Sequence, residues 1–270
     1  FRRSQTDRDF REIALDLIMT ELLRVDHLNK HYPGFALQDV SFSVKPGRIM
    51  GLIGKNGAGK STTLKSILNI VQPQSGIVSI LGKDFYQNEK ECKQEIGVVF
   101  GGIDFYPLKK LSTITAVTSR FYKDWDQNRY TEYLRQFSLD ESKQFRTLSN
   151  GMKVKYLLAL ALSHHAKLYL LDEPTSGLDP VSRDEILHLF TRIVKDGKRS
   201  ILFSTHITSD LDRCADDITY IQNGKVLQSA DKDTFLRSFD RLKTPEDSKP
   251  LTLEEIMLRT EGRNSDETAL

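Results

Sequence analysis

The chain has few cysteines, no long hydrophobic run and no excess of charge of one sign. Its two cysteines, Cys92 and Cys214, are too few for a disulfide framework, so we expect reduced thiols. The longest apolar runs, at 156–162 and 168–171, are much shorter than the ~20 residues of a membrane-spanning helix. The 39 basic and 37 acidic side chains nearly cancel, which predicts no long-range attraction to nucleic acid or to an anionic membrane surface. Partners must therefore be inferred from individual sites.

The composition is that of a globular protein of one large or two small domains. Of 270 residues, 39% are hydrophobic and 28% are charged, which supplies an adequate core. Residues 1–18 lack the apolar segment of a secretory signal, and we expect them to be an N-terminal extension outside the core. Residues 231–270 are weakly amphipathic and become strongly polar over 261–267. They predict a C-terminal tail with a disordered end.

Apolar runs and turn residues predict an α/β fold. Alternating residues between 22 and 44 indicate two antiparallel strands joined at Pro33-Gly34. Between about 112 and 162 the apolar positions follow a helical period, which predicts an inserted α-helical subdomain of about 104–165 within a core of 19–230. A helix is expected over 180–194. The remaining short strands, which predict a mostly parallel sheet flanked by helices, are 76–82, 96–100, 168–171, 200–203 and 218–221.

A glycine-rich loop separates an apolar strand at 48–53 from a predicted helix that begins near Thr62. Its glycines allow successive backbone N–H groups to face a polyphosphate, and the helix N-terminus adds its positive dipole end. Lys60 can reach the β- and γ-phosphates, and Ser61 offers a hydroxyl to Mg²⁺. A glycine-rich turn before an ordinary helix is the alternative, which the flanking elements disfavour. The predicted nucleotide-binding residues are Gly54, Asn56, Gly57, Ala58, Gly59, Lys60, Ser61 and Thr62.

Two carboxylates follow the buried strand at 168–171. Asp172 and Glu173 lie at its C-terminal end, where doubly wound sheets bind ligands. We predict that Asp172 holds Mg²⁺ directly or through water, and that Glu173 polarises the attacking water. Taken alone, the pair would fit a solvated strand end before the Pro174 turn. The phosphate loop makes the catalytic interpretation preferable.

Three further segments occur in a fixed order: Leu-Ser-Asn-Gly-Met at 148–152, Ser-Gly-Leu-Asp at 176–179 and Ser-Thr-His at 204–206. With the phosphate loop and the acidic pair, the chain resembles the nucleotide-binding subunit of ABC transporters over about 22–230. The resemblance implies an ABC-ATPase core of the P-loop NTPase class, with an N-terminal antiparallel β subdomain and a helical subdomain. The order of the five motifs makes it more specific than any single motif.

The resemblance also implies roles for individual residues. Tyr32 would stack on adenine, or else be an exposed turn aromatic. Ser149 and Gly151 would form the signature, and Ser149 would also cap the following helix. Asp179 would be the D-loop aspartate or only a helix cap. His206 would sense the γ-phosphate, since it follows a buried strand, although a lone histidine is more often structural.

Two positions depart from the family pattern. Gly101-Gly102 stand where the family has a glutamine that contacts Mg²⁺, so the Q-loop role stays unassigned. Asp104 lies nearby in the sequence, but nothing in the sequence supports giving it this role. The signature ends in Met152 instead of glutamine. This second change should affect the rate more than the mechanism, because Ser149 and backbone N–H groups would bind the phosphate.

The resemblance implies an ATPase that uses ATP and Mg²⁺ and drives a separate transmembrane permease subunit. Two ATP-binding subunits, identical or related, would pack head to tail, so that Ser149 and Gly151 of one close over the nucleotide held by the other. The location would be cytoplasmic, peripheral on the cell membrane. Phe121, Tyr122, Trp125 and Asp126 resemble Ytr-type bacterial exporters of antibiotics, peptides or lipids, although these aromatics also fit a subdomain core.

Other classes remain open at this point. One is a soluble ABC ATPase that acts on ribosomes or DNA, but such proteins usually carry two cassettes, a coiled-coil insertion or a strongly basic surface. Another is a regulatory ATP-binding protein without turnover, which Glu173 and His206 disfavour. Neither the transported compound nor the direction of transport is encoded in any motif of this chain.

Overall fold

The computed structural model describes residues 21–100, 106–244, 247 and 249–267, with side chains up to Glu261. The predicted extension 1–18 and the Gly101-Gly102 segment lie outside these residues. The strands are β1 (Leu23–Tyr32), β2 (Phe35–Val44), β3 (Ile49–Ile53), β4 (Ser75–Ile80), β5 (Lys83–Asp84), β6 (Ile96–Phe100), β7 (Leu168–Asp172), β8 (Ser200–Thr205), β9 (Asp217–Gln222) and β10 (Lys225–Asp231). The helices are α2 (Lys60–Ile67), α3 (Glu89–Cys92), α4 (Leu111–Thr118), α5 (Gln127–Gln136), α6 (Asn150–Leu162), α7 (Pro180–Val194), α8 (Thr208–Cys214), α9 (Lys232–Ser238) and α10 (Leu253–Glu267).

The larger sheet has six strands in the order β10-β9-β3-β8-β7-β6. All neighbouring pairs are parallel except β9 with β10. Every residue of β3, β7, β8 and β9 is buried, as expected for parallel strands covered on both faces. The register pairs Ile53 with Thr205 and Asp172 with Ser204. The segments that follow β3, β7 and β8 therefore leave the sheet at the same edge.

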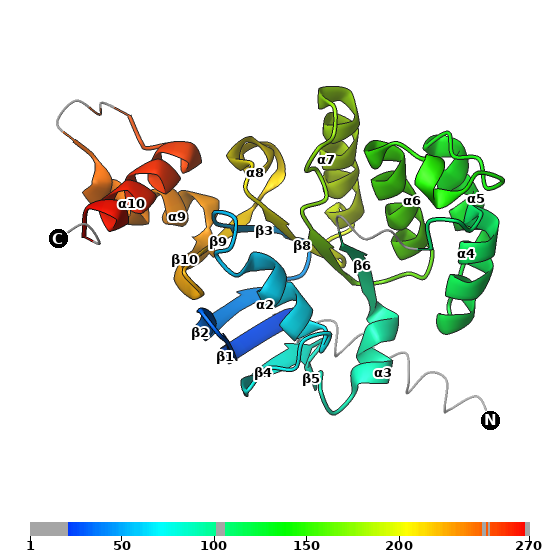
Figure 1. Ribbon diagram of the computed structural model, residues 1–270, viewed down its shortest axis with the longest axis horizontal. Coiled ribbons are helices and arrows are strands. Elements are labelled where there is room, and N and C mark those ends of the chain that lie inside the picture. Colours follow the sequence, from blue (N-terminus) through cyan, green and yellow to red (C-terminus); the bar gives the residue numbers. More distant parts are fainter. Residues whose placement is uncertain (1–20, 101–105, 245–246, 248, 268–270) are drawn as a thin grey trace.

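The smaller sheet is antiparallel, with strand order β2-β1-β4-β5. Helix α2 contacts both β2 and β7, so it lies between the two sheets (Figure 1). Its Leu64 and Ile67 share one core with Leu168 and Leu170 of β7. Tyr169 and Leu171 point to the other face, into a second core with α6 and α7. This period of two along β7 confirms the predicted α/β fold and its two covered faces.

Helices α4, α5 and α6 form the predicted helical region, with a core of its own around Tyr130, Phe145 and Tyr156. The Thr115 hydroxyl lies within hydrogen-bond distance of both Tyr130 and Tyr156 hydroxyls, at 2.7 and 3.0 Å. These aromatics therefore belong to a packed interior with satisfied polar groups. Among the described residues, no helix combines the length and hydrophobicity needed to cross a bilayer.

The expectation of a disordered polar end over 261–267 is wrong, because these residues are the last part of helix α10. Leu253 and Ile256 are fully buried, in the core that also contains Phe235 and Phe239. The helix begins with a capping box: the Thr252 hydroxyl accepts from the Glu255 N–H at 3.2 Å, and the Glu255 carboxylate accepts from the Thr252 N–H at 2.7 Å. The sequence of this helix is only weakly amphipathic, which gives little indication of a helix. A few deeply buried residues nevertheless pack it against the core.

Candidate nucleotide site

The phosphate loop adopts a backbone conformation that requires glycine. Gly54, Gly57 and Gly59 have φ angles of 156°, 82° and 115°, where L side chains are strained. A Cβ on Gly54 would lie 2.3 Å from the Ile221 carbonyl oxygen. Helix α2 begins directly after Gly59 without a capping side chain. Its first N–H groups are therefore left for an anion, as the sequence predicts.

Lys60 is the cation of the loop, and its side chain is only 5% exposed. Its Nζ donates to the carbonyl oxygens of Gly54 at 2.8 Å and Lys55 at 3.2 Å. It also lies 3.3 Å from Glu173 Oε1. A buried ammonium needs such acceptors, and their position keeps the charge of Lys60 at the centre of the loop.

Asp172 receives two hydroxyl groups on one oxygen. Ser61 Oγ donates to Oδ1 at 3.0 Å, and Ser204 Oγ donates to the same atom at 2.6 Å. The structure thus brings together Ser61 and Asp172, the two residues predicted to hold Mg²⁺. Ser204 was given no role from the sequence, although its place beside Asp172 follows from the parallel register.

Glu173 has a strained backbone and two charged neighbours. Its φ is 49°, a left-handed conformation that glutamate rarely adopts and that costs about 1–3 kcal/mol. Its N–H donates to Ser204 Oγ at 2.9 Å, which fixes this conformation. Its Oε2 lies 2.9 Å from His206 Nδ1, while Oε1 faces Lys60. The turn after β7 therefore directs Glu173 toward the phosphate loop and separates it from Asp172.

The signature and D-loop residues lie at two neighbouring helix starts. Ser149 Oγ accepts from the Met152 N–H at 3.2 Å and caps α6. Asp179 accepts from the N–H groups of Val181 and Ser182 at 3.1 and 3.0 Å and caps α7. These hydrogen bonds, above all that from Ser182, lower the pKa of Asp179. A Cβ on Gly151 would lie 3.2 Å from Ser182 Oγ, so the two helices approach closely here.

Tyr32 ends β1 and is 41% exposed. The ammonium of Lys30 lies 5.2 Å from the ring centroid. In the hairpin Tyr32 pairs with Phe35, and a Cβ on Gly59 would lie 3.1 Å from Phe35 Cζ. The hairpin therefore packs against the phosphate loop, which brings an exposed aromatic close to it.

A buried carboxylate links the loops after β7 and β8 and was missed in the sequence. Asp210 of α8 is fully buried and accepts from the Thr175 hydroxyl at 2.6 Å and from Arg183 Nε. Arg183 also donates to Ser209 Oγ at 2.8 Å. Thr175 follows Glu173, Arg183 follows Asp179, and Asp210 follows His206. The Asp210 carboxylate thus ties together, through one ion pair and one hydrogen bond, the three segments that carry these predicted site residues.

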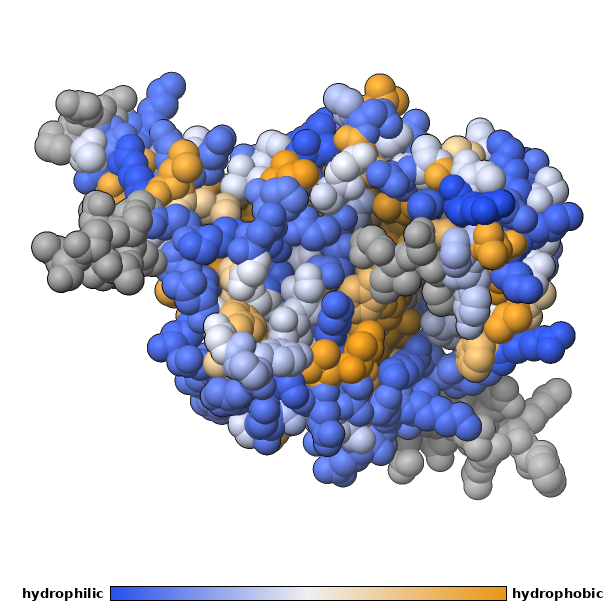
Figure 2. Space-filling model, viewed as in Figure 1, coloured by the Kyte–Doolittle hydropathy of each residue, from blue (hydrophilic) through white to orange (hydrophobic). Residues whose placement is uncertain are grey.

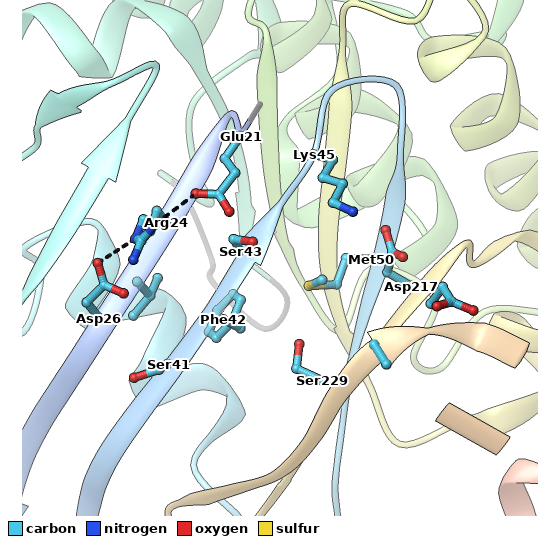
Figure 3. A pocket seen from close by; sticks show the side chains of 13 residues that line it. Glu21, Arg24, Asp26, Ser41, Phe42, Ser43, Lys45, Met50, Asp217 and Ser229 are labelled. Atoms are coloured by element: carbon cyan, nitrogen blue, oxygen red, sulfur yellow. Dashed lines mark hydrogen bonds and ion pairs between the residues drawn. The ribbon is translucent and has the colours of Figure 1, made fainter. Parts of the chain in front are cut away.

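A separate cavity of about 460 Å³ lies between the two sheets (Figure 3). It is lined by Met50 and Asp217, a pair at the start of β3 and β9, whereas the phosphate loop follows the end of β3. Arg24 on its wall pairs with Asp26 at 2.7 Å and with Glu21 at 3.7 Å. This cavity is therefore at the opposite end of the strands from the phosphate loop and is not part of the candidate nucleotide site.

The fold and the phosphate loop together define a P-loop domain for nucleoside triphosphates. Residues 37–176 match the family described as ABC transporter. The chain belongs to this family and is an ATP-binding subunit of an ABC transporter, an ATPase, which confirms the family predicted from the motif order.

Two curated relatives come from Bacillus. The bacitracin transport ATP-binding protein BcrA of Bacillus licheniformis is 32% identical over 78% of this chain and 70% of its own length. The ABC transporter ATP-binding protein YtrB of Bacillus subtilis is 30% identical over 76% of this chain and 70% of its own. A solved structure of an ATP-binding subunit of an ABC transporter is 28% identical, with a TM-score of 0.78 over 89% of this chain and 99% of that chain.

Proposed function

We propose that this subunit hydrolyses ATP at a site shared by two head-to-tail subunits and so drives an exporter of an antibiotic, peptide or lipid. The observation that carries the proposal is the convergence of Lys60, Glu173 and His206 at one edge of the sheet. In this proposal Lys60 binds the β- and γ-phosphates, Glu173 is the general base for water, and His206 contacts the γ-phosphate and orients Glu173. The relative that transports bacitracin supports the substrate class.

The residues at the metal position fit Mg²⁺. Ser61 and Asp172 present a hydroxyl and a carboxylate oxygen 3.0 Å apart, and Mg²⁺ takes oxygen ligands from one or two protein groups together with phosphates and water. No cluster of three or more His, Cys, Asp or Glu side chains competes as a metal site among the described residues. When bound by Ser61 and Asp172, Mg²⁺ would neutralise phosphate charge.

In the proposed dimer each nucleotide site is shared by two subunits, which accounts for the location of the signature residues Ser149 and Gly151 on a different helix from the phosphate loop. Ser149 caps α6, which packs on α5, α7 and β6, while the phosphate loop precedes α2. The exposed N-terminus of α6 offers N–H groups and a positive dipole end to an anion held by a second subunit. Tyr32 is proposed to stack on adenine and so to complete the site. It would do so beside the phosphate loop, which contains Asn56, Ala58 and Thr62. The partner is a second copy of this chain or a related subunit.

If the site is shared by two subunits, ATPase activity per subunit should rise with protein concentration. A monomer would bind ATP but lack the partner's signature, so its turnover should be at least about tenfold slower than that of the dimer. Phosphate release should be measured from nanomolar to micromolar protein at saturating ATP and Mg²⁺, with subunit association followed by light scattering. Specific activity that stays constant while monomer and dimer exchange would contradict the shared site.

An exposed apolar groove offers a surface for the permease. A hollow of about 360 Å³ is bordered by Ile70 and Phe121, which are 59% and 72% exposed. It shares Val98 and Tyr122 with a second hollow of about 230 Å³. Figure 2 shows apolar surface in this region, between α2 and β6. We propose that a cytoplasmic segment of the permease binds here, which would place the subunit on the cytoplasmic face of the membrane.

Groove substitutions should abolish co-purification with the permease. A tagged full-length chain should co-purify from detergent extracts with a membrane protein of several spans. We expect the Phe121→Asp and Ile70→Asp variants not to co-purify with it, because each substitution would bury a charge in the interface. Ile77→Asp, at another exposed apolar residue (56% exposed), is the matched control. Capture of ribosomes or DNA in place of a membrane protein would contradict the transport function and support the soluble alternative.

A further inference from the structure

The C-terminal helix contacts the phosphate loop through an ion pair. Glu261 Oε2 lies 2.8 Å from Nζ of Lys55, a residue of the loop between Gly54 and Asn56. The Glu261 side chain is only 19% exposed and that of Lys55 is 55% exposed. The other carboxylate oxygen accepts from the Tyr220 hydroxyl at 3.2 Å, and Tyr220 is fully buried in β9. A core residue therefore holds the carboxylate of α10 against the loop.

Lys55 joins this ion pair to the proposed catalytic residues. Its carbonyl oxygen accepts from Lys60 Nζ at 3.2 Å and from the Ala58 N–H at 3.1 Å. Lys60 in turn lies 3.3 Å from Glu173. Each lysine of the loop is thus paired with a carboxylate, Lys60 with that of Glu173 and Lys55 with that of Glu261.

The ion pair between Lys55 and Glu261 disfavours binding of a polyphosphate to the loop. Burial raises the pKa of Glu261, but the Lys55 ammonium, the Gln222 side-chain amide and the Tyr220 hydroxyl lower it, and the net pKa lies below the usual value. Glu261 is therefore ionised at neutral pH and repels a polyphosphate. A bound triphosphate would also compete for Lys55, whose half-exposed side chain can exchange one anionic partner for another.

We propose that Glu261 is a positioning residue that competes with the phosphates of ATP for Lys55. The docked C-terminal helix then lowers the ATP affinity of the loop, and bound ATP loosens the end of α10 to the same extent, because coupling between two sites is reciprocal. The start of α10 stays in place through Leu253, Ile256 and the capping box. This inference rests on the proposed nucleotide site.

A double-mutant cycle on the full chain tests the competition. Equilibrium binding of a fluorescent ATP analogue is measured for the wild type, Glu261→Gln, Lys55→Gln and the double variant. We expect Glu261→Gln to bind about fivefold tighter, Lys55→Gln to bind more weakly, and Glu261→Gln to have a much smaller effect in the Lys55→Gln background, where only its direct repulsion of the phosphates is relieved. Glu254→Gln is the control for helix and charge, since Glu254 is exposed on the same helix.

Hydrogen exchange provides a second readout that a merely structural role would not change. ATP should accelerate amide exchange at 257–261 in the wild type but not in Lys55→Gln, while 253–256 stays protected. Unchanged or weaker ATP binding by Glu261→Gln, or an equal effect in both backgrounds, would overturn the competition while leaving the nucleotide site intact. A wild-type chain that binds no ATP would overturn both proposals.

Discussion

Replacing Glu173 with glutamine should lower ATP hydrolysis by about 10²–10³-fold while nucleotide binding is kept, because removal of a general base typically costs this much. Glutamine conserves the size of the side chain, so the turn after β7 and the hydrogen bond from its N–H to Ser204 stay formed. The substitution removes a negative charge 3.3 Å from Lys60, and this should favour a bound polyphosphate. We therefore expect an ATP-bound dimer that persists. Phosphate release measures the loss, and light scattering with ATP measures the dimer.

Two further variants make the Glu173→Gln result specific. Glu132 is exposed on α5, so Glu132→Gln should hydrolyse ATP at the wild-type rate. His206 Nδ1 lies 2.9 Å from Glu173 Oε2, so the two residues act as a unit and their effects should not add. His206→Ala should cost little more in the Glu173→Gln background. Retention of more than a tenth of the activity by Glu173→Gln would show that another group activates the water.

The phosphate loop and the strands could be predicted because their signals are local. Glycines in fixed positions before Lys60, and an unbroken apolar run before Asp172, each specify a backbone conformation that neighbouring residues alone determine. The parallel arrangement then follows from the alternation of strands and helices, and it brings Ser61, Asp172 and His206 to one edge. Sequence spacing is sufficient for this part of the site.

The remaining features depend on contacts between distant segments, which spacing does not encode. The α10 helix is weakly amphipathic, and its docking depends on Leu253 and Ile256 meeting a core formed by other elements. Its one local signal is the capping box at Thr252 and Glu255, and the strongly polar segment that ends the helix favours disorder by composition. No local pattern shows that Glu261 meets Lys55 or that Asp210 is the buried carboxylate among the acidic residues of α8.

Asp210→Ala should lower the free energy of unfolding by about 3 kcal/mol. The carboxylate is fully buried, and its removal leaves Arg183 Nε and the Thr175 hydroxyl without an acceptor. Breaking a buried ion pair by deleting one partner costs about 3–5 kcal/mol, and the 26% exposure of Arg183 favours the lower end. Urea unfolding followed by circular dichroism measures the change.

The control for Asp210 lies on the same helix. Asp212 is 52% exposed and 3.7 Å from Lys232, so Asp212→Ala should cost less than about 1 kcal/mol. Asp210→Asn separates stability from catalysis, because it keeps the side-chain volume but weakens the tie between Thr175 and Arg183. These residues follow Glu173 and Asp179, so hydrolysis should fall even where Asp210→Asn is fully folded. Normal hydrolysis by this folded variant would mean that Asp210 stabilises the subunit without positioning its catalytic loops.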